Sequence, residues 1–443
     1  MFLVVLMGCI ITSLLSTALT TALPPIMEAF RITASVGQWL TSVYSLVMAI
    51  VVLASAWLIK RFPTKKLYTS ALSLFCAGLL IDALAVSFPV LMAGRLLQAC
   101  GNGILMSLSQ VVLLTIYPPE RRGSVMGMYG LAVGAAPVIA PTLAGLIVDC
   151  FGWRMIFTAT FVISVIALIL AGILVENVTE NKVQKLDMLS LLLCGLGSVG
   201  ILLGLGNTGT YGVVSVPVFL PLCIGIAASI VFCFRQLRLE KPFLEIRIFR
   251  NFEFRTAVIG SMLLYAVMIS ASTLMPILIQ SVYGYAAAVS GLAMMPGALA
   301  MAVISPFTGK IYDRFGIRKL FIVGSLALFF SSMILSYLTE HTSLIYLASA
   351  NLVRTVAIGC LMMSLVTWGM SRLNPEHTAD GTSMLTALRT VAGSIGSAVF
   401  VSVMTLTSRA SADLRGMRIT FLCLTALAAV EVIIAVFCTK EKK

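Results

Sequence analysis

Apolar runs of about 18 or more residues recur along the whole 443-residue chain, and this pattern constrains the fold more than any other feature. Hydrocarbon offers no partner for backbone polar groups, so a chain crosses a membrane only as helices or as a closed barrel. A barrel would show short strands of alternating polarity, whereas these runs are long and continuous. The sequence therefore predicts an all-α, polytopic membrane protein.

The composition agrees with a membrane location. The chain is 60% hydrophobic and only 11% charged, which leaves too few polar residues to cover a soluble protein of this size. We predict about fourteen transmembrane helices, at residues 3–23, 37–59, 68–86, 89–117, 122–149, 152–175, 188–208, 212–234, 256–280, 286–308, 319–338, 343–370, 381–407 and 418–438. Twelve helices remain an alternative if 188–234 does not contain two spans.

The basic residues give an orientation. A net charge of +13 can indicate nucleic-acid binding, but most of the 30 Lys and Arg residues lie in short, alternate loops between apolar runs. The positive-inside rule places those loops, and both termini, in the cytoplasm. We therefore expect a multi-pass protein of the cell membrane with the lipid bilayer as its partner, and no nucleic acid.

Cysteine and histidine patterns give no sign of a catalytic or metal centre. The ten cysteines lie almost entirely in or beside the apolar runs without paired spacing, and the two histidines form no ligand cluster. No nucleotide-binding loop of the GxxxxGK[ST] type occurs. We expect a protein that is not an enzyme and that holds neither metal nor cofactor.

An internal repeat divides the chain. WLIKRFPTKKLY (57–68) and GKIYDRFGIRKLF (309–321) are similar basic turns, and each precedes a helix with an intramembrane arginine, Arg95 or Arg354. Two-fold repeats are typical of secondary transporters, whose substrate site lies between the repeats. We predict a six-helix bundle at 1–177, a linker with two extra central helices at 178–255, and a pseudo-symmetric six-helix bundle at 256–443. Chance similarity between apolar helices is the alternative.

Several further motifs resemble one family. They are TTALPPI (20–26), WLTSVYSLVMA (39–49), RLLQACGNG (95–103), the segment 117–157, and ALRTVAGSIGSA (387–398). In these the chain resembles the major facilitator superfamily, in particular its fourteen-span drug:proton antiporters such as the lincomycin and multidrug resistance exporters. The resemblance implies a monomer that exports amphipathic small molecules by alternating access. Protons are then the second partner, and the proton gradient takes the place of a cofactor.

Arg95 is the first candidate for proton coupling. A charge inside the bilayer costs roughly 2.5–3.5 kcal/mol on insertion scales, so it normally has a function. The resemblance implies that Arg95 and Gln98 take part in coupling, with Arg95 helping a nearby carboxyl to release its proton. The alternative is structural, with Arg95 bound to backbone carbonyls.

The sequence offers several candidates for the acid that carries the proton. The related antiporters have an aspartate in the first helix, at the place that Leu15 occupies here. We favour Asp82, which is close to Arg95 in sequence and lies toward the same side of the membrane. Asp149 lies at an outer helix end, and Glu431 lies in the last helix, where a packing role is expected.

The second-half basic turn is the candidate gate. The resemblance implies that a charge cluster there locks two helices when the inner side is closed, whereas the simpler alternative is a solvated loop. The gating residues are Gly309, Asp313, Arg314, Gly316 and Arg318. The first-half copy departs from the family pattern, since Lys60 stands at the usual place of the acid and Pro63 at that of a glycine.

Two further groups of residues complete the candidate site. A small-residue face with GxxxG spacing and two prolines allows close packing and bending, and the resemblance implies that it is the antiporter helix; it comprises Gly130, Gly134, Pro137, Pro141 and Gly145. The candidate cavity residues are Trp39, Tyr44, Arg354 and Arg389. Export or facilitated passage of an endogenous metabolite, peptide or lipid remains open, as does a membrane sensor on a transporter fold.

Overall fold

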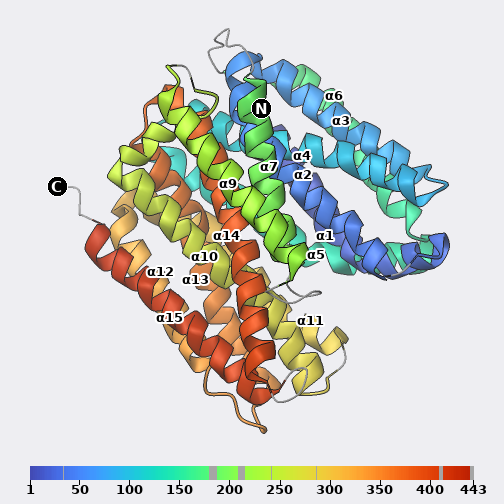
Figure 1. Cartoon of the computed structure of the whole chain (residues 1–443), viewed down its shortest axis with the longest axis vertical. Helices are drawn as coiled ribbons and strands as arrows, with labels where there is room; N and C mark the ends of the chain where they lie inside the picture. The colour runs from blue at the N-terminus through green and yellow to red at the C-terminus, as the bar shows by residue number, and fades with distance from the viewer. Residues whose placement is uncertain are drawn as a thin grey trace.

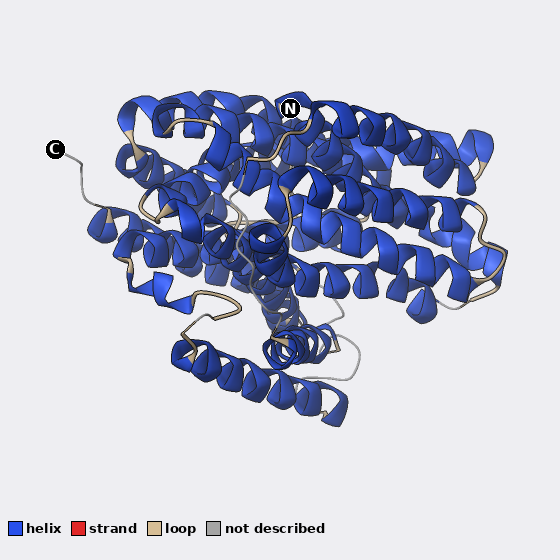
Figure 2. Ribbon diagram, turned by 90° about the horizontal axis from the view of Figure 1, so that it is seen from above, coloured by secondary structure: helices blue, strands red, loops and turns tan. Residues whose placement is uncertain are grey.

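The computed structural model describes residues 1–32, 34–178, 187–207, 215–240, 242–285, 287–408 and 413–439. Within these residues the regular structure is helical, with no strand (Figure 2). The long helices are α1 (Phe2–Phe30), α2 (Ala34–Arg61), α3 (Thr64–Ala83), α4 (Phe88–Ile116), α5 (Arg122–Phe151), α6 (Arg154–Leu174), α7 (Met188–Gly206), α9 (Val216–Arg238), α10 (Phe252–Ile277), α11 (Ala287–Phe315), α12 (Ile317–Ile334), α13 (Leu344–Ser371), α14 (Thr378–Thr407) and α15 (Leu414–Cys438).

Twelve helices in the described part of the chain are long and apolar enough to cross a membrane. The other two long helices, α1 and α5, contain residues whose side chains are not described. At about 1.5 Å per residue, both are also long enough to span the hydrocarbon core. The all-α membrane fold predicted from the apolar runs is confirmed, and about fourteen remains the approximate number of spans.

The helices form two bundles with a hairpin between them in sequence. Helices α1–α6 (blue to cyan) and α10–α15 (yellow-green to red) occupy different sides of Figure 1. Helices α7 and α9 pack against each other, and α7 also contacts α2 and α14, which belong to different bundles. The predicted boundary at 177 follows α6, and the one at 255 falls in the first turn of α10.

The two bundles meet through α5 with α11 and α2 with α14. Helices α2 and α11 end, and α5 and α14 begin, at the same end of the molecule, which we call the basic end. It carries basic residues predicted to lie in the cytoplasmic loops, among them Lys60, Arg121, Arg314 and Arg318. Gly316, with φ 72°, turns the chain between α11 and α12, and this left-handed backbone favours glycine.

Candidate transport site

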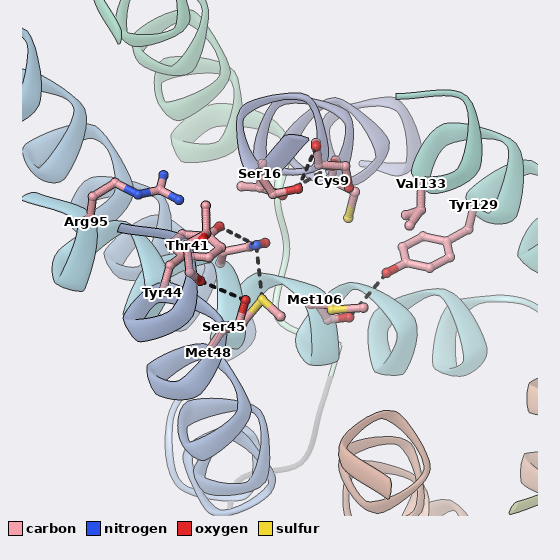
Figure 3. Close-up of a pocket in the computed structure, with 13 residues that line it drawn as sticks. Cys9, Ser16, Thr41, Tyr44, Ser45, Met48, Arg95, Met106, Tyr129 and Val133 are labelled. Atoms are coloured by element: carbon pink, nitrogen blue, oxygen red, sulfur yellow. Dashed lines mark hydrogen bonds between the residues drawn. The ribbon is translucent and has the colours of Figure 1, made fainter. Parts of the chain in front are cut away.

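A cavity of about 410 Å³ lies among the middle turns of α1, α2, α4 and α5 (Figure 3). Its lining is rich in hydroxyl groups and carries a few thioether and aliphatic side chains. The lining residues are Cys9, Thr12, Ser13, Ser16, Thr41, Tyr44, Ser45, Met48, Arg95, Asn102, Met106, Tyr129 and Val133. A cavity that offers both hydroxyl groups and apolar side chains suits an amphipathic small molecule.

Arg95 supplies the positive charge of this cavity. Its side chain is only 1% exposed, and its guanidinium carbon lies 4.0 Å from the centre of the Tyr44 ring. Such stacking on an aromatic face stabilises a desolvated cation. Figure 3 shows Arg95 and Tyr129 on opposite sides of the cavity. Asn102 donates a hydrogen bond to the Tyr44 hydroxyl at 2.7 Å and so fixes the ring.

Three of the residues predicted for proton coupling form one chain of hydrogen bonds. Arg95 Nη1 donates to Gln98 Oε1 at 2.7 Å, and Gln98 Nε2 donates to Asp82 Oδ2 at 2.7 Å. Asp82 and Gln98 are fully buried. Gln98 thus bridges a buried acid on α3 to a buried cation on α4, and we call these three residues the relay.

Two glycines that we did not predict allow this arrangement. A Cβ atom at Gly94 would lie 1.9 Å from Asp82 Oδ1, and one at Gly78 would lie 2.5 Å from the carbonyl oxygen of Gly94. The relay therefore depends on a close approach of α3 and α4 that larger residues would prevent. The small residues Gly78 and Gly94 on successive helices were the sequence signal that could have predicted this close approach.

The other predicted cavity residues lie elsewhere. Tyr44 is the exception among the four predicted residues, because it lines the cavity. Trp39 is 46% exposed and is not part of the lining. Arg389 is buried, with its guanidinium carbon 4.7 Å from the centre of the Tyr265 ring. Arg354 is buried and donates to Asn351. Neither arginine lines this cavity, because α13 and α14 contribute nothing to its walls.

The alternative acids differ from Asp82. Glu431 on α15 is fully buried, and neither carboxyl oxygen has a hydrogen-bond partner among the described residues. Asp149 lies outside the residues whose side chains are described. Leu15 is buried and apolar, at the place where the related antiporters have an acid. Of the two candidate acids whose side chains are described, Asp82 and Glu431, Asp82 is connected to the cavity through Gln98 and Arg95.

The predicted gate residue Asp313 joins the two bundles through the first turn of α5. Its carboxylate accepts from the backbone N–H groups of Gly123 and Ser124, both at 2.8 Å, and from Ser124 Oγ at 2.6 Å. These groups form the first turn of α5, where a negative charge is stabilised by the helix dipole. Arg314 is exposed, with its guanidinium carbon 5.2 Å from the Phe315 ring centre. Arg318 is half-buried at the start of α12.

Gly309 marks the close approach of α5 and α11. A Cβ atom there would lie 2.2 Å from the Gly123 carbonyl oxygen, and one at Gly127 would lie 2.5 Å from that of Ser305. Gly123 and Gly127 have GxxxG spacing, a signal that the sequence analysis missed. Small residues at the start of α5 thus let the bundles touch.

The predicted antiporter helix is α5. Gly130 faces the other bundle, since a Cβ atom there would lie 2.7 Å from Met363 Cγ. Gly145 is half-buried further along the helix. Gly134, Pro137 and Pro141 lie outside the residues whose side chains are described.

A second connection between the bundles was not predicted. Lys60 at the end of α2 forms a salt bridge with Asp380 in the first turn of α14. Deeper in the same seam, Ser383 of α14 lies 3.3 Å from Ser55 and 2.8 Å from Ser107, measured between the hydroxyl oxygens. Both connections lie toward the basic end.

Known proteins are similar to this chain over nearly its whole length. Residues 5–397 match the Major Facilitator Superfamily. The uncharacterized MFS-type transporter YcnB of Bacillus subtilis is 39% identical over 434 residues, which are 96% of this chain and 92% of that protein. The lincomycin resistance protein LmrB of Listeria innocua is 34% identical over 398 residues, 89% of this chain and 84% of that protein.

Solved structures share the fold at low sequence identity. The human organic anion transporter MFSD10 has a TM-score of 0.73 at 14% identity, covering 98% of each chain. The Escherichia coli fucose:proton symporter FucP has a TM-score of 0.67 at 14% identity, covering 99% of this chain and 98% of that one.

Proposed function

This chain belongs to the major facilitator superfamily and is a multi-pass membrane transporter, and we propose that it exports amphipathic small molecules in exchange for protons. Relatives described as lincomycin and multidrug resistance proteins support drug efflux. The cell membrane is the proposed location, with the basic end and both termini in the cytoplasm. No catalytic chemistry is involved in this proposal, because the gradient supplies the driving force.

The observation that carries the proposal is the relay. Asp82 is buried, yet a single glutamine connects it to the cation at the cavity wall. An intramembrane acid joined to a basic residue in this way is typical of a proton-coupled site. Through the relay, protonation of Asp82 on α3 changes the net charge at the cavity wall, where a substrate would bind.

Charge balance gives the sign of the coupling. With Asp82 ionised, the carboxylate and the Arg95 guanidinium neutralise each other across Gln98. A proton on Asp82 leaves Arg95 unbalanced, which gives the cavity wall a net positive charge in a low-dielectric site. That charge disfavours an apolar or cationic substrate, so proton and substrate compete. Exchange requires that the proton and the substrate compete for the same carrier. The proton lowers the affinity for substrate, and the substrate lowers the affinity for the proton by the same factor.

The seam contacts support alternating access. The connections made by Asp313, Lys60 and Ser383 hold the bundles together toward the basic end. In the proposed orientation these contacts close the cytoplasmic side. Rocking of the bundles would have to break them before the cavity opens to the cytoplasm.

Purified protein in liposomes tests the proposal. Lincomycin and a cationic dye are offered as probes with an imposed pH gradient, while an internal pH indicator reports proton movement. Probe-dependent proton movement that exceeds the rate of empty liposomes supports antiport. Probe flux that is indifferent to the gradient supports facilitation instead, which the apolar Leu15 favours as the second candidate.

A further inference from the structure

The internal repeat places opposite charges at equivalent positions. Lys60 in KRF (60–62) corresponds to Asp313 in DRF (313–315), at the end of α2 and α11 respectively. The helices that they contact are also equivalent, because PERRGS (119–124) leads into α5 as PEHTAD (375–380) leads into α14. Ser124 therefore corresponds to Asp380. In one seam the acid is at the end of α11, whereas in the other it is at the start of α14.

In the α5–α11 seam the acid comes from the opposite bundle. Helix α5 has no acidic residue in its first turn. Asp313 of α11 supplies the negative charge and accepts three hydrogen bonds from Gly123 and Ser124. While the bundles are in contact, these N–H groups at the start of α5 therefore receive a charged acceptor from the other bundle.

In the α2–α14 seam the helix carries its own acid. Asp380 lies in the first turn of α14 and is fully buried. Its Oδ2 atom accepts from Lys60 Nζ of the other bundle, and His377 Nδ1 of its own bundle lies 3.7 Å away. The Lys60 side chain is 23% exposed, so water can reach the pair when it separates. A cation is the complementary partner for a helix start that already holds a carboxylate.

We propose that Lys60 and Asp380 form a charge-reversed counterpart of the contact between Asp313 and α5, and that both contacts must separate before the basic end opens. Lys60 is then a positioning residue for the closed state, although its place in the family pattern is that of an acid. Without Lys60, closure would bury the Asp380 carboxylate without the cation that the other bundle supplies, which is costly. This inference requires alternating access but is independent of the substrate and of proton coupling.

Distance measurements between spin labels test the inference in reconstituted full-length protein. The labels are attached to p-acetylphenylalanine at Glu120 and Asn374, which are exposed in the equivalent loops before α5 and α14. This chemistry leaves the ten native cysteines in place. The variants are Lys60→Asp, Asp380→Lys, the double exchange of both residues, and Lys66→Asp as a matched charge change at an exposed position.

We expect the protein and its Lys66→Asp variant to populate mainly the short distance. Lys60→Asp and Asp380→Lys each shift the closed-to-open ratio by about tenfold or more toward the long distance. The double exchange restores most of the short-distance population. If a single exchange does not fold, Lys60→Gln, which removes the charge without reversing it, replaces it.

Two results would overturn the inference. One is a double exchange that remains as open as the single variants, because the pair then does not act through mutual attraction. The other is a Lys60→Asp or Lys60→Gln variant that matches Lys66→Asp, because the salt bridge then contributes nothing to closure. Neither result bears on export itself, which the liposome experiment tests separately.

Discussion

Arg95 and Arg354 occupy corresponding places in the two bundles but have different surroundings. Both are buried, at 1% and 2% exposure. Arg95 reaches an acid through Gln98, lies over a tyrosine and lines the cavity. Arg354 donates to Asn351. Each of the two arginines has two nitrogens without a hydrogen-bond partner in the described structure, so the difference lies in the groups around them. In the proposed mechanism the first bundle is the site of proton coupling, because there the cation is bridged to a buried acid.

The largest effect should follow from neutralising the acid that distinguishes the bundles. We expect Asp82→Asn to reduce gradient-driven transport by about tenfold to a hundredfold, since coupling between two sites typically has this size. Probe binding should be largely intact, because Asp82 does not line the cavity. Transport in liposomes at several imposed gradients and equilibrium binding provide the measurements. The matched control is Glu431→Gln, and a loss confined to that variant would move the coupling acid to α15.

Substitution of the two arginines sharpens the comparison directly. Lysine keeps the charge but lacks the planar fork that bonds Gln98 while stacking on Tyr44. We expect Arg95→Lys to lower coupled transport by about tenfold and Arg354→Lys by less than about threefold. Both rates are measured in the same liposome assay at equal protein content. Equal losses would contradict the assignment of coupling to the first bundle.

The bridging amides should give a smaller difference. Gln98→Leu separates Asp82 from Arg95 without removing either charge, and we expect a loss of about threefold to tenfold, the net worth of a typical hydrogen bond. The pH at which transport is half-maximal should also move. Asn351→Leu removes the corresponding amide beside Arg354 and should leave that pH unchanged. A shift of equal size in both variants would count against a special role for the relay.

Close helix packing beneath the relay can be tested through stability. We expect Gly94→Ala to lower the thermal unfolding temperature, with overpacking worth about 1–3 kcal/mol, because the new methyl group collides with Asp82. Gly172→Ala in α6 is the control, since a Cβ atom there has no neighbour within 4 Å. Fluorescence-monitored unfolding in detergent compares the two. If Gly94→Ala is as stable as Gly172→Ala, the relay geometry does not depend on this contact.

The smallest effect concerns an ion pair at the water interface, in contrast to the buried relay. Burial alone would raise the pKa of Asp187, but hydrogen bonds from Ser190 and Arg235 outweigh it and lower the pKa. The stabilisation is thus present above pH about 4 and is lost as the pH falls through the lowered value in the folded protein. We expect Asp187→Asn to cost about 0–1 kcal/mol at pH 7, because both side chains are partly exposed. Unfolding temperatures of both proteins at pH 7 and at low pH should converge as the acid protonates.

Much of the fold follows from the sequence because lipid imposes simple rules. Apolar runs of spanning length require helices, and the repeat of KRF and DRF indicated two related bundles. The proximity of Asp82 and Arg95 was also predictable, since two costly charges on successive helices gain by lying near each other. Their bridge through Gln98 follows from i,i+3 spacing along α4.

The details of the seam could not be predicted in the same way. The partner of Asp313 is a set of backbone N–H groups, which leave no charge pattern in the sequence. Asp380 was missed because it lies 320 residues from Lys60, and only the alignment of PERRGS with PEHTAD makes the exchange visible. Trp39 was placed in the cavity on the family pattern, but exposure of this residue depends on the rotation of α2, which spacing alone does not fix.

The position of α7 has a mechanical consequence. This helix touches α2 on one side and α14 on the other, so it bears on both moving bodies at once. In the proposed alternating-access cycle, at least one of the two bundles must therefore slide along the surface of α7. At Gly195 of α7 the surface toward α2 has no side chain, and a Cβ atom there would lie 3.9 Å from Ile50 Cγ2. Helix α2 therefore meets little steric resistance at this point. The hairpin of α7 and α9 therefore acts as a sliding surface between the bundles. We expect bulkier side chains on that surface to lower the rate of transport.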